Sequence, residues 1–361
     1  MRHFFKSNRL ISAIACLAVA VLFSGCGVNT QTVRVTSYVS TDSTVYSSTA
    51  EIVKQVADSV VEIQTESLQT QWGMQYVVSG AGSGVIVAHD ESYETYYIVT
   101  NNHVISGARQ IKVALRSGET YSASLVAVDE TGDIAVVSIK ESNTLNVAVW
   151  GSSASLQIGE DVIAIGNPLG SLGGTVTKGI ISAKERSIPV GNYTMTLLQT
   201  DTAINPGNSG GGLFNMRGEL VGIVNAKTSD EEVEGICFAI PEQNARAIFH
   251  DLVTNGVVTG RVTFGIDVTV GNGNVVFVTD VTDAVAGTFA MYDRIYKING
   301  RTISSMLDYH DALASVEPGD SVPVEVYRGT VQSGWYGSSL AFDSNVTAFN
   351  VTAKQLQAKA A

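Results

Sequence analysis

The sequence has little charge, few cysteines and no surplus of basic residues, and each shortage excludes a class of protein. Charged residues make up 16% of its 361 residues and hydrophobic residues 45%, a balance that excludes an intrinsically disordered chain. Its 22 Lys and Arg stand against 34 Asp and Glu, for a net charge of −12. Without a basic stripe, such a chain is a poor ligand for nucleic acid or anionic membranes. The length suits two folded domains with tails.

The N-terminal segment lacks a hydrophobic run long enough to cross a membrane comfortably. Its apolar run, residues 10–23, follows a basic start and is about 14 residues long, whereas a spanning helix needs about 20. This pattern predicts an export signal over residues 1–25. Ser24 and Gly25 before Cys26 resemble a bacterial lipobox, although Phe23 stands where that pattern prefers Leu. We therefore expect Cys26 to carry lipid; an uncleaved anchor and simple secretion are the alternatives.

The three cysteines do not provide a disulfide framework. Cys16 leaves with the export signal and Cys26 carries lipid in this interpretation, so Cys237 remains alone. Because Cys237 lies inside a β segment, we expect a small buried hydrophobic residue there. Residues 26–50 are rich in Ser and Thr with almost no large apolar side chain, which predicts a flexible tether.

No helical pattern separates the short β-branched segments that follow, which argues against βαβ units and a parallel sheet. A short amphipathic helix from Ala50 precedes them, and a helix over residues 243–255 closes a first, all-β domain spanning residues 51–257. Residues 258–352 form a second, smaller α+β domain with one helix over residues 306–314, and residues 353–361 form a tail. The expected strands of the first domain are residues 60–63, 84–88, 96–100, 111–115, 134–139, 162–165, 179–183, 195–199, 219–225 and 235–240.

The strongest chemical signal is the G-x-S-x-G pattern around Ser209. Glycines near a serine let backbone N–H groups converge on an oxyanion, and the serine needs a base to become a nucleophile. The pattern also fits the nucleophile elbow of an α/β-hydrolase, but there a helix follows the serine, and the acid and base come later in the chain. Here a turn and strands follow Ser209, while His103 and Asp133 precede it. The order His, Asp, Ser is that of a chymotrypsin-type barrel.

These motifs together resemble the HtrA (Deg) family of serine proteases. The resemblance implies a chymotrypsin-like double β-barrel with the site between two packed six-stranded barrels. It assigns His103 as general base and then acid, Asp133 as the group that holds its tautomer, and Ser209 as the nucleophile. The N–H groups of Gly207 and Ser209 would form the oxyanion hole. The matching strings, in the family's order, are TNNHV, GDIAVVSI, IGNPLG, TVTKGIISA, TDTAINPGNSGG, GELVGI and FAIP.

Two positions depart from the family's pattern, and two other carboxylates compete with Asp133. Gly132 stands where Thr is common, and Gly212 where Pro or Ala is frequent; neither change removes a catalytic atom. Asp129 and Asp201 are the alternative acids, which we expect to be turn or capping residues. No metal and no organic cofactor are expected, because the remaining histidines lack the spacing of metal ligands. Those histidines are His89, His250 and His310.

The pocket for the residue before the cut bond is expected between three segments: residues 202–206, 223–227 and 235–238. By resemblance, Ile204 and Ile236 face into it. A buried cation would lack a carboxylate partner there, so cleavage after Lys or Arg is disfavoured. Two branched side chains also leave little depth, and we expect small aliphatic residues before the cut, with modest discrimination.

Residues 258–352 resemble a PDZ domain. VTFGI at residues 262–266 occupies the place of the carboxylate-binding loop and strand, and residues 292–300 match the D-x-I-x-x-I-N-G core, with Tyr292 in place of a common Gly. The resemblance implies that a peptide pairs with the strand after Phe264, its terminal carboxylate on backbone N–H groups of this segment. The peptide-binding residues would be Phe264, Gly265 and Ile266. A PDZ domain that only spaces the protease is the alternative.

Together these features predict an exported, ATP-independent serine endopeptidase that degrades unfolded or mislocalised proteins. We expect it at the bacterial cell envelope, outside the cytoplasm and anchored through lipidated Cys26, with its PDZ domain as regulator. Its partners would be unfolded proteins and peptide C-termini, and the family resemblance implies a homotrimer through the protease domains. The rival interpretation is a chaperone or peptide-binding scaffold whose triad is kept inactive by its loops.

Overall fold

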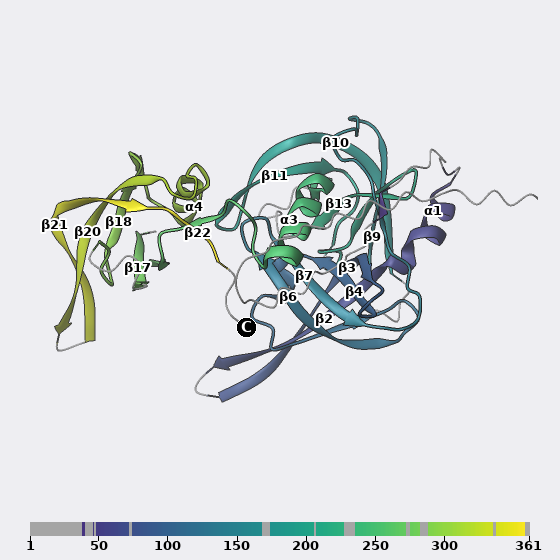
Figure 1. The fold of residues 1–361 in the computed structure, drawn as a ribbon, viewed down its shortest axis with the longest axis horizontal. Helices are drawn as coiled ribbons and strands as arrows, with labels where there is room; N and C mark the ends of the chain where they lie inside the picture. Colours follow the sequence, from purple (N-terminus) through teal and green to yellow (C-terminus); the bar gives the residue numbers. More distant parts are fainter. Residues whose placement is uncertain are drawn as a thin grey trace, which may run out of the picture.

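The computed structural model describes most of the chain from residue 48 onward. The predicted export signal, Cys26 and most of the predicted tether lie outside the described residues. Within the part that is described, no helix combines the length and the apolar character needed to span a membrane. Figure 1 shows a larger β domain joined to a smaller one. The described residues are 38–39, 46, 48–71, 74–167, 174–205, 207–226, 235–271, 275–281, 288–334 and 337–357.

The first half of the larger domain is a closed barrel in the order β2-β3-β4-β7-β6-β5. Its strands are rich in β-branched residues that pack well on a pleated surface. The interior holds mainly Val and Ile side chains, such as Ile63, Ile86 and Ile98, all fully buried. The strands are β2 (Val60–Gln71), β3 (Met74–Asp90), β4 (Thr95–Thr100), β5 (Gln110–Ala114), β6 (Thr120–Asp129) and β7 (Ile134–Lys140).

The second half is a circuit of six strands in the order β13-β12-β9-β10-β11-β14, which an additional β13–β14 pairing closes. Two short strands, β1 (Tyr38–Val39) and β8 (Val149–Trp150), extend it through parallel pairing. The double β-barrel expected from the family resemblance is therefore confirmed. The strands of the circuit are β9 (Asp161–Gly166), β10 (Thr175–Val190), β11 (Tyr193–Thr200), β12 (Gly212–Asn215), β13 (Glu219–Asn225) and β14 (Cys237–Pro241).

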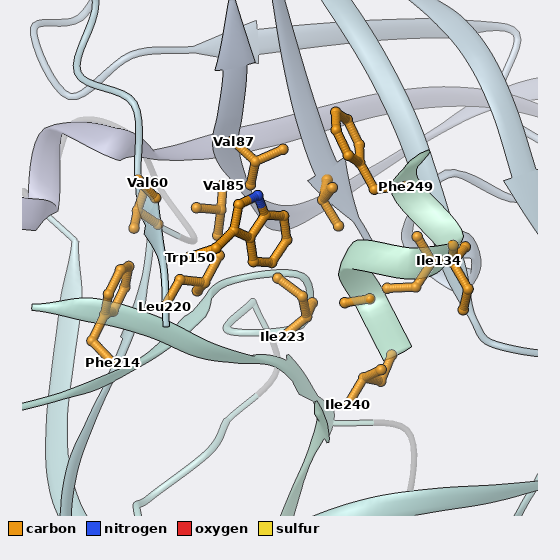
Figure 2. Close-up of a cluster of buried hydrophobic side chains, with 14 of the residues drawn as sticks. Val60, Val85, Val87, Ile134, Trp150, Phe214, Leu220, Ile223, Ile240 and Phe249 are labelled. Carbon is orange, nitrogen blue, oxygen red and sulfur yellow. The ribbon is translucent and has the colours of Figure 1, made fainter. Parts of the chain in front are cut away.

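One hydrophobic cluster joins the two barrels and fixes their relative position. Figure 2 shows Trp150 between Val85 and Val87 of the first barrel and Leu220 and Ile223 of the second. Trp150 is fully buried. Because a buried aromatic side chain removes a large apolar area from water, this cluster holds together the two surfaces that meet at the site.

Helices cover the barrels where the sequence pattern predicted them. Helix α1 (Thr49–Val56) begins after Ser48, whose Oγ accepts a hydrogen bond from the Glu51 N–H, and it buries Ile52 and Val56. After this helix, Val60 begins strand β2, as predicted. Helix α3 (Glu242–Asn255) ends at Gly256, which has a φ of 73° and closes the helix in the left-handed conformation that glycine favours.

The smaller domain is a sheet in the order β16-β17-β18-β20-β21, with β19 paired to β18, and it carries helix α4 (Met306–Ala314). A separate pair joins β15 to β22. The expected α+β architecture is confirmed, and the helix has the predicted bounds. The strands are β15 (Val262–Thr263), β16 (Ile266–Gly271), β17 (Val275–Val281), β18 (Arg294–Ile298), β19 (Arg301–Thr302), β20 (Ser321–Gly334), β21 (Gly337–Thr352) and β22 (Lys354–Gln355).

Tyr292 shows why glycine is common at its position in PDZ domains. Its φ is 71°, in the left-handed region that side chains disfavour. The next residue, Asp293, is fully buried and forms an ion pair with Arg328. Burial raises the pKa of Asp293 above its usual value, and the nearby Arg328 guanidinium opposes that rise.

Candidate active site

The two barrels bring His103, Asp133 and Ser209 to one place. Strands β4 and β7 pair with Thr100 opposite Ala135, so the chain just after β4 and the chain just before β7 meet at one edge of the first barrel. His103 lies there in the short helix α2 (Asn102–Ile105), and Asp133 directly precedes β7. Ser209 comes from the second barrel, in the turn before β12.

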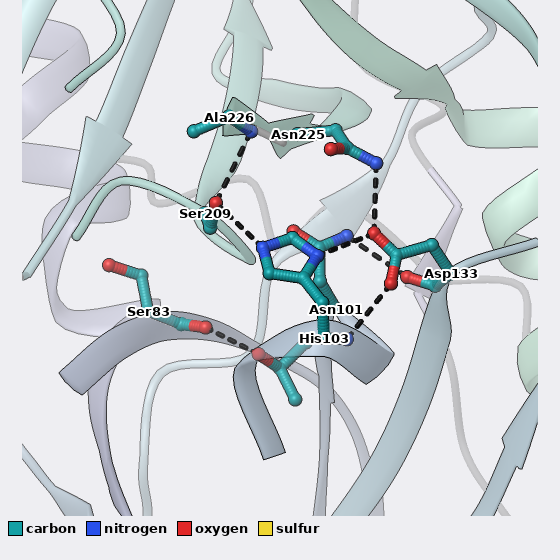
Figure 3. Close-up of polar contacts among 8 residues, drawn as sticks. Ser83, Asn101, His103, Asp133, Ser209, Asn225 and Ala226 are labelled. Carbon is teal, nitrogen blue, oxygen red and sulfur yellow. Dashed lines mark hydrogen bonds and ion pairs between the residues drawn. The ribbon is translucent and has the colours of Figure 1, made fainter. Parts of the chain in front are cut away.

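These three side chains form a continuous chain of hydrogen bonds (Figure 3). His103 Nδ1 lies 2.7 Å from Asp133 Oδ2, and His103 Nε2 lies 3.1 Å from Ser209 Oγ. Because an ionised carboxylate only accepts hydrogen bonds, Nδ1 carries the ring proton and Nε2 is left to accept from the serine hydroxyl. The His103 side chain is 22% exposed and that of Asp133 7%, so the carboxylate is shielded while the imidazole stays accessible.

Two asparagines that sequence reasoning did not single out hold Asp133. Asn225 Nδ2 donates to Asp133 Oδ2 at 2.9 Å, and Asn101 Nδ2 donates to the Asp133 backbone carbonyl at 3.0 Å. Asp133 needs such support because its φ of 49° is unusual for a residue with a side chain. The sequence carried one signal for Asn225, which is a polar residue at the end of the strongly apolar sequence ELVGIVN. In the structure Asn225 is only 1% exposed.

Ser83 of β3 holds the turn that carries Ser209. The Ser83 N–H donates to the Ser209 carbonyl at 2.8 Å, and Ser83 Oγ donates to the Gly207 carbonyl at 2.6 Å. Gly207 has a φ of 102°, and Gly210 has a φ of 82°. A side chain on Gly210 would also collide with the Ser83 carbonyl. The turn therefore depends on glycine at both positions.

The Ser209 hydroxyl has a second partner besides His103. The Ala226 N–H donates to Ser209 Oγ at 3.2 Å, so the oxygen can accept from Ala226 while its own proton points to the imidazole. No described residue accepts a hydrogen bond from the N–H of Gly207 or of Ser209. These are the two groups predicted to form the oxyanion hole.

The residues expected to shape the specificity pocket differ in their exposure. Ile204 is half-buried and packs against the cluster that contains Leu198 and Leu213. Ile236, directly before β14, is 41% exposed. Asp201 Oδ1 accepts from the Ile180 N–H at 2.6 Å, so this carboxylate, directly after β11, binds to the backbone of strand β10.

Two parts of the expected pocket wall, Pro206 and Lys227, lie outside the described residues. The prediction that Cys237 is buried was wrong. Cys237 is half-buried, because it is the first residue of β14 and lies opposite Thr200, the last residue of β11.

Both departures from the family's pattern have a steric reason. A Cβ at Gly132 would lie 2.5 Å from Ile248 Cδ1 and 2.6 Å from Asp129 Oδ2. A Cβ at Gly212 would collide with the Phe214 ring. In this chain the neighbouring side chains fill the space that a larger residue would need.

The alternative acid and the other histidines have different roles in the structure. Asp129 accepts from the Gly132 N–H at 3.0 Å and from Arg261 Nη2 at 2.8 Å, so it holds the turn before Asp133 and does not contact His103. No cluster of three or more His, Cys, Asp or Glu side chains suited to a metal occurs among the described residues. His89 stacks on Tyr96, the His250 side chain is 74% exposed, and His310 packs against Tyr193.

The predicted peptide-binding segment of the PDZ domain lies at an edge of its sheet. Strand β16, which begins at Ile266, pairs only with β17 among the described strands and leaves its other edge open. Gly265 has a φ of 69°, which suits the turn into this strand. The Phe264 side chain is fully buried against Phe289. Phe264 can therefore offer a peptide only its main chain.

The two domains touch beside the turn that carries Asp133. The ring centroids of His310 in α4 and Tyr193 in β11 lie 4.1 Å apart. The Tyr193 hydroxyl also donates to Glu130 Oε2 at 3.3 Å. Arg261, in the segment between the domains, pairs with Asp129. Burial lowers the pKa of His310 to about 4, because the charged imidazolium loses its hydration there.

Comparisons with known proteins agree with this architecture. Residues 82–223 match the family described as trypsin-like peptidase domain, and residues 262–334 match the PDZ domain family. The serine endoprotease DegS of Salmonella typhimurium is 36% identical over 299 residues, covering 78% of this chain and 82% of that protein. Serine protease Do-like HtrB of Bacillus subtilis is 40% identical over 273 residues, which cover 68% of this chain and 59% of HtrB.

Solved structures give the same result. The serine endoprotease from Yersinia pestis has a TM-score of 0.54 and 34% identity, covering 87% of this chain and 100% of that one. The HtrA-type protease AlgW with a decapeptide has a TM-score of 0.55 and 30% identity, covering 86% and 99%. The fold and site thus define a chymotrypsin-type peptidase domain joined to a PDZ domain. The chain belongs to the HtrA/Deg family of serine proteases. It spans 59% and 51% of the two Bacillus subtilis relatives, HtrB and HtrA.

Proposed function

We propose that this protein is a serine endopeptidase that uses His103, Asp133 and Ser209 as its catalytic triad. The observation that carries the proposal is the continuous hydrogen-bond chain from Ser209 Oγ through the His103 imidazole to the Asp133 carboxylate. Neither a metal nor an organic cofactor takes part in the reaction we propose. ATP is not needed either, because the hydrolysis of a peptide bond by water is itself thermodynamically favourable.

The reaction follows from the atoms that meet at the site. Ser209 Oγ attacks the carbonyl carbon of the substrate and gives its proton to His103 Nε2. Asp133 stabilises the imidazolium and keeps Nδ1 protonated, and Asn225 fixes the carboxylate from the other side. His103 then protonates the leaving amine, the bond to the amine breaks, and water repeats the sequence on the acyl-enzyme. The N–H groups of Gly207 and Ser209 stabilise the oxyanion of both tetrahedral intermediates.

We propose unfolded or mislocalised proteins as substrates, cut after small aliphatic residues. Ile204 and Ile236 narrow the specificity pocket in this proposal. Asp201 does not supply a carboxylate for a basic side chain, since its Oδ1 already accepts from the Ile180 N–H. The position of the active-site residues between two packed barrels supports an extended, unfolded substrate. A folded protein could reach them only with a segment that extends away from its own structure.

The PDZ domain regulates the protease in our proposal. The open edge of β16 suits β-augmentation by a peptide C-terminus, with its carboxylate at the turn around Gly265 and Ile266. A peptide with a free apolar C-terminus should raise the hydrolysis rate, and its amidated form should bind much more weakly, because charge-assisted hydrogen bonds are the stronger ones. Equal binding of the two peptides in a calorimeter would exclude carboxylate capture.

We propose that the protein works at the bacterial cell envelope, outside the cytoplasm. The relatives support this location, since one of them, from Bartonella henselae, is named a probable periplasmic serine endoprotease. Attachment through lipidated Cys26 and assembly into a homotrimer complete the proposal. Mass spectrometry of the N-terminal peptide tests the lipid, and sedimentation of the purified protein tests the trimer.

Hydrolysis of a permanently unfolded protein tests the proposed activity. Purified full-length chain should cleave casein, and the Ser209→Ala variant should be slower by about 10⁴-fold or more. A fluorophosphonate, which reacts only with an activated serine, should label the native chain and spare the variant. Equal residual cleavage by both proteins, together with no labelling, would mean that the triad is silent and the protein a binding scaffold.

A further inference from the structure

Strands β2 and β3 continue past the first barrel as a two-stranded arm, which we define as residues 67–71 and 74–78. Within the barrel β2 also pairs with β5, but that pairing ends at Glu66. Strand β3 pairs with β4 only from Val85 onward. Among the described strands the arm is therefore paired only with itself, from Ser67 opposite Val78 to Gln71 opposite Met74. Figure 1 shows it projecting from the barrel.

The arm carries no charge and exposes several apolar side chains, although the protein as a whole is acidic. No charged residue occurs from Ser67 to Ala88 in a chain of net charge −12. Near the tip, Met74 is 70% exposed, Val77 61% and Tyr76 40%. Because successive residues of a strand point to opposite faces, Met74 and Tyr76 lie on one face of the ribbon and Val77 on the other. A two-stranded ribbon is only marginally stable in water by itself, and exposed apolar side chains on both of its faces suit a partner that pairs with its edge.

Strand β3 connects this arm directly to the active site. The Ser83 N–H donates to the Ser209 carbonyl. A Cβ on Gly82 would lie 2.6 Å from Val104 Cγ1, in the residue after His103, and 3.4 Å from the Ser209 carbonyl oxygen. Strand β3 thus passes between the nucleophile and the histidine side of the site, and from there it runs outward into the arm.

The course of β3 indicates whether the residues before or after the cut bond of a substrate lie along the arm. The leaving amine must lie on the side of His103, because His103 protonates it. The specificity pocket, by contrast, is expected around Ile204 and the segment after β13, on the Ala226 side of Ser209. A polypeptide in the site therefore sends the residues that follow the cut bond past Gly82 and along the outer edge of β3.

We propose that the arm binds the part of an unfolded polypeptide substrate that follows the cut bond. This inference rests on the proposed protease function. An extended chain can pair with the edge of β3 from Gly82 to Met74, which β4 leaves open, and its apolar side chains can pack on Met74, Tyr76 and Val77. The lack of charge makes the arm tolerant of sequence. At about 3.4 Å per residue, this edge spans about 27 Å and contacts roughly eight substrate residues.

The experiment compares two substrates on full-length protein. Both fluorogenic peptides carry the same residues up to a Val before the cut; one continues for two residues after it and the other for ten, mostly apolar and uncharged. The test variant combines Met74→Ser, Tyr76→Ser and Val77→Ser. The control variant combines Leu125→Ser and Ile158→Ser, which are exposed apolar residues (53% and 68%) outside the arm.

We expect the arm variant to raise KM for the long peptide about tenfold, the effect of losing one or two apolar contacts, and to leave kcat unchanged. KM for the short peptide should stay as in the native protein, and the control variant should match the native protein on both. Thermal unfolding of all three proteins verifies that they fold. If the native protein cleaves neither peptide, the protease function fails, which is distinct from failure of the arm.

Three outcomes would overturn the proposal. The long and short peptides could lose activity equally, which would make the arm a support of the site. The arm variant could change only the mass of the assembly, which would make the arm a subunit contact. It could instead lose only binding to neutral phosphatidylcholine vesicles, which would make the arm a membrane contact.

Discussion

Removing the Asn225 side chain should slow catalysis without touching any reacting atom. Asp133 Oδ2 accepts two hydrogen bonds, from His103 Nδ1 at 2.7 Å and from Asn225 Nδ2 at 2.9 Å. In the Asn225→Ala variant the second bond is lost at a buried carboxylate. The carboxylate keeps its bonds from His103, whose backbone N–H donates to Oδ1 at 2.9 Å, but it is held less firmly in the orientation in which it stabilises the imidazolium that forms during the reaction.

The expected size follows from the strength of that bond. A hydrogen bond to a charged group is worth about 1.5 to 3 kcal/mol, and each 1.4 kcal/mol changes a rate about tenfold. We therefore expect kcat/KM for a short peptide to fall about 10- to 100-fold. The loss should appear mostly in kcat, because Asn225 acts through Asp133 and His103 rather than on the bound peptide.

Asn215 provides a matched control for the loss of a buried amide. It is 1% exposed, lies in the same barrel as Asn225, and its Nδ2 donates to the Glu219 carboxylate at 2.7 Å. Asn215→Ala should therefore lower the unfolding temperature about as much as Asn225→Ala but leave kcat/KM unchanged. Asn225→Asp preserves the size of the side chain and replaces the donor with a like charge, so its kcat should fall further.

The assay is hydrolysis of a short fluorogenic peptide at fixed pH, with fluorophosphonate labelling as a count of active serines. A kcat for Asn225→Ala within twofold of the native value would refute the reasoning. The same conclusion would follow if Asn215→Ala and Asn225→Ala lowered kcat equally, since the effect would then be one of general stability.

Two further predictions concern stability and the contact between the domains. Gly132→Thr, which restores the residue common in the family, should lower the free energy of unfolding by about 1 to 3 kcal/mol, because its Cβ would lie 2.5 Å from Ile248 Cδ1; an unfolding temperature equal to the native one would contradict this. His310 binds its proton less readily when packed on Tyr193, with a pKa of about 4 against 6.5, so the packed arrangement is favoured above pH 6.5 and is progressively lost as the pH falls toward 4. The protection factors of the α4 amides, which correct for the intrinsic pH dependence of hydrogen exchange, should fall over that range and stay constant in His310→Gln; an unchanged pH dependence of the protection factors in the variant would exclude His310 as the cause.

The sequence predicted the cores of the strands well and their ends poorly. Val60, Ile134 and Glu219 begin strands where the β-branched pattern predicts them, since these strands are buried and the pattern records burial. It did not predict β6, residues 120–129, whose first half is small and polar and whose residues are mostly half-exposed or exposed, nor the part of β2 after Ile63, which leaves the barrel beyond Glu66. Exposed strands need no apolar side chains, so nothing in their composition marks them.

Site residues that belong to a motif of adjacent residues could be predicted from the sequence. Site residues that act through a partner far away in the sequence could not. His103, Asp133 and Ser209 each stand in a motif of adjacent residues. Ser83 and Asn225 do not, although each forms a hydrogen bond to this group. Their roles depend on the pairing of strands from two barrels, and that pairing is a property of the whole fold.

The choice between Asp129 and Asp133 depended on the motif around Asp133, because composition and burial do not distinguish the two residues. Both are aspartates at the turn before β7, and both are 5% exposed, so neither composition nor burial separates them. Their partners do. Asp133 faces His103 across the β4–β7 pair, whereas Asp129 accepts from the Gly132 N–H and from Arg261, which lies 132 residues further along the chain, between the domains. Asp129 therefore connects the turn that carries Asp133 to the segment that leads into the PDZ domain. A displacement of that segment would reach Asp133 through Gly132, the residue directly before it.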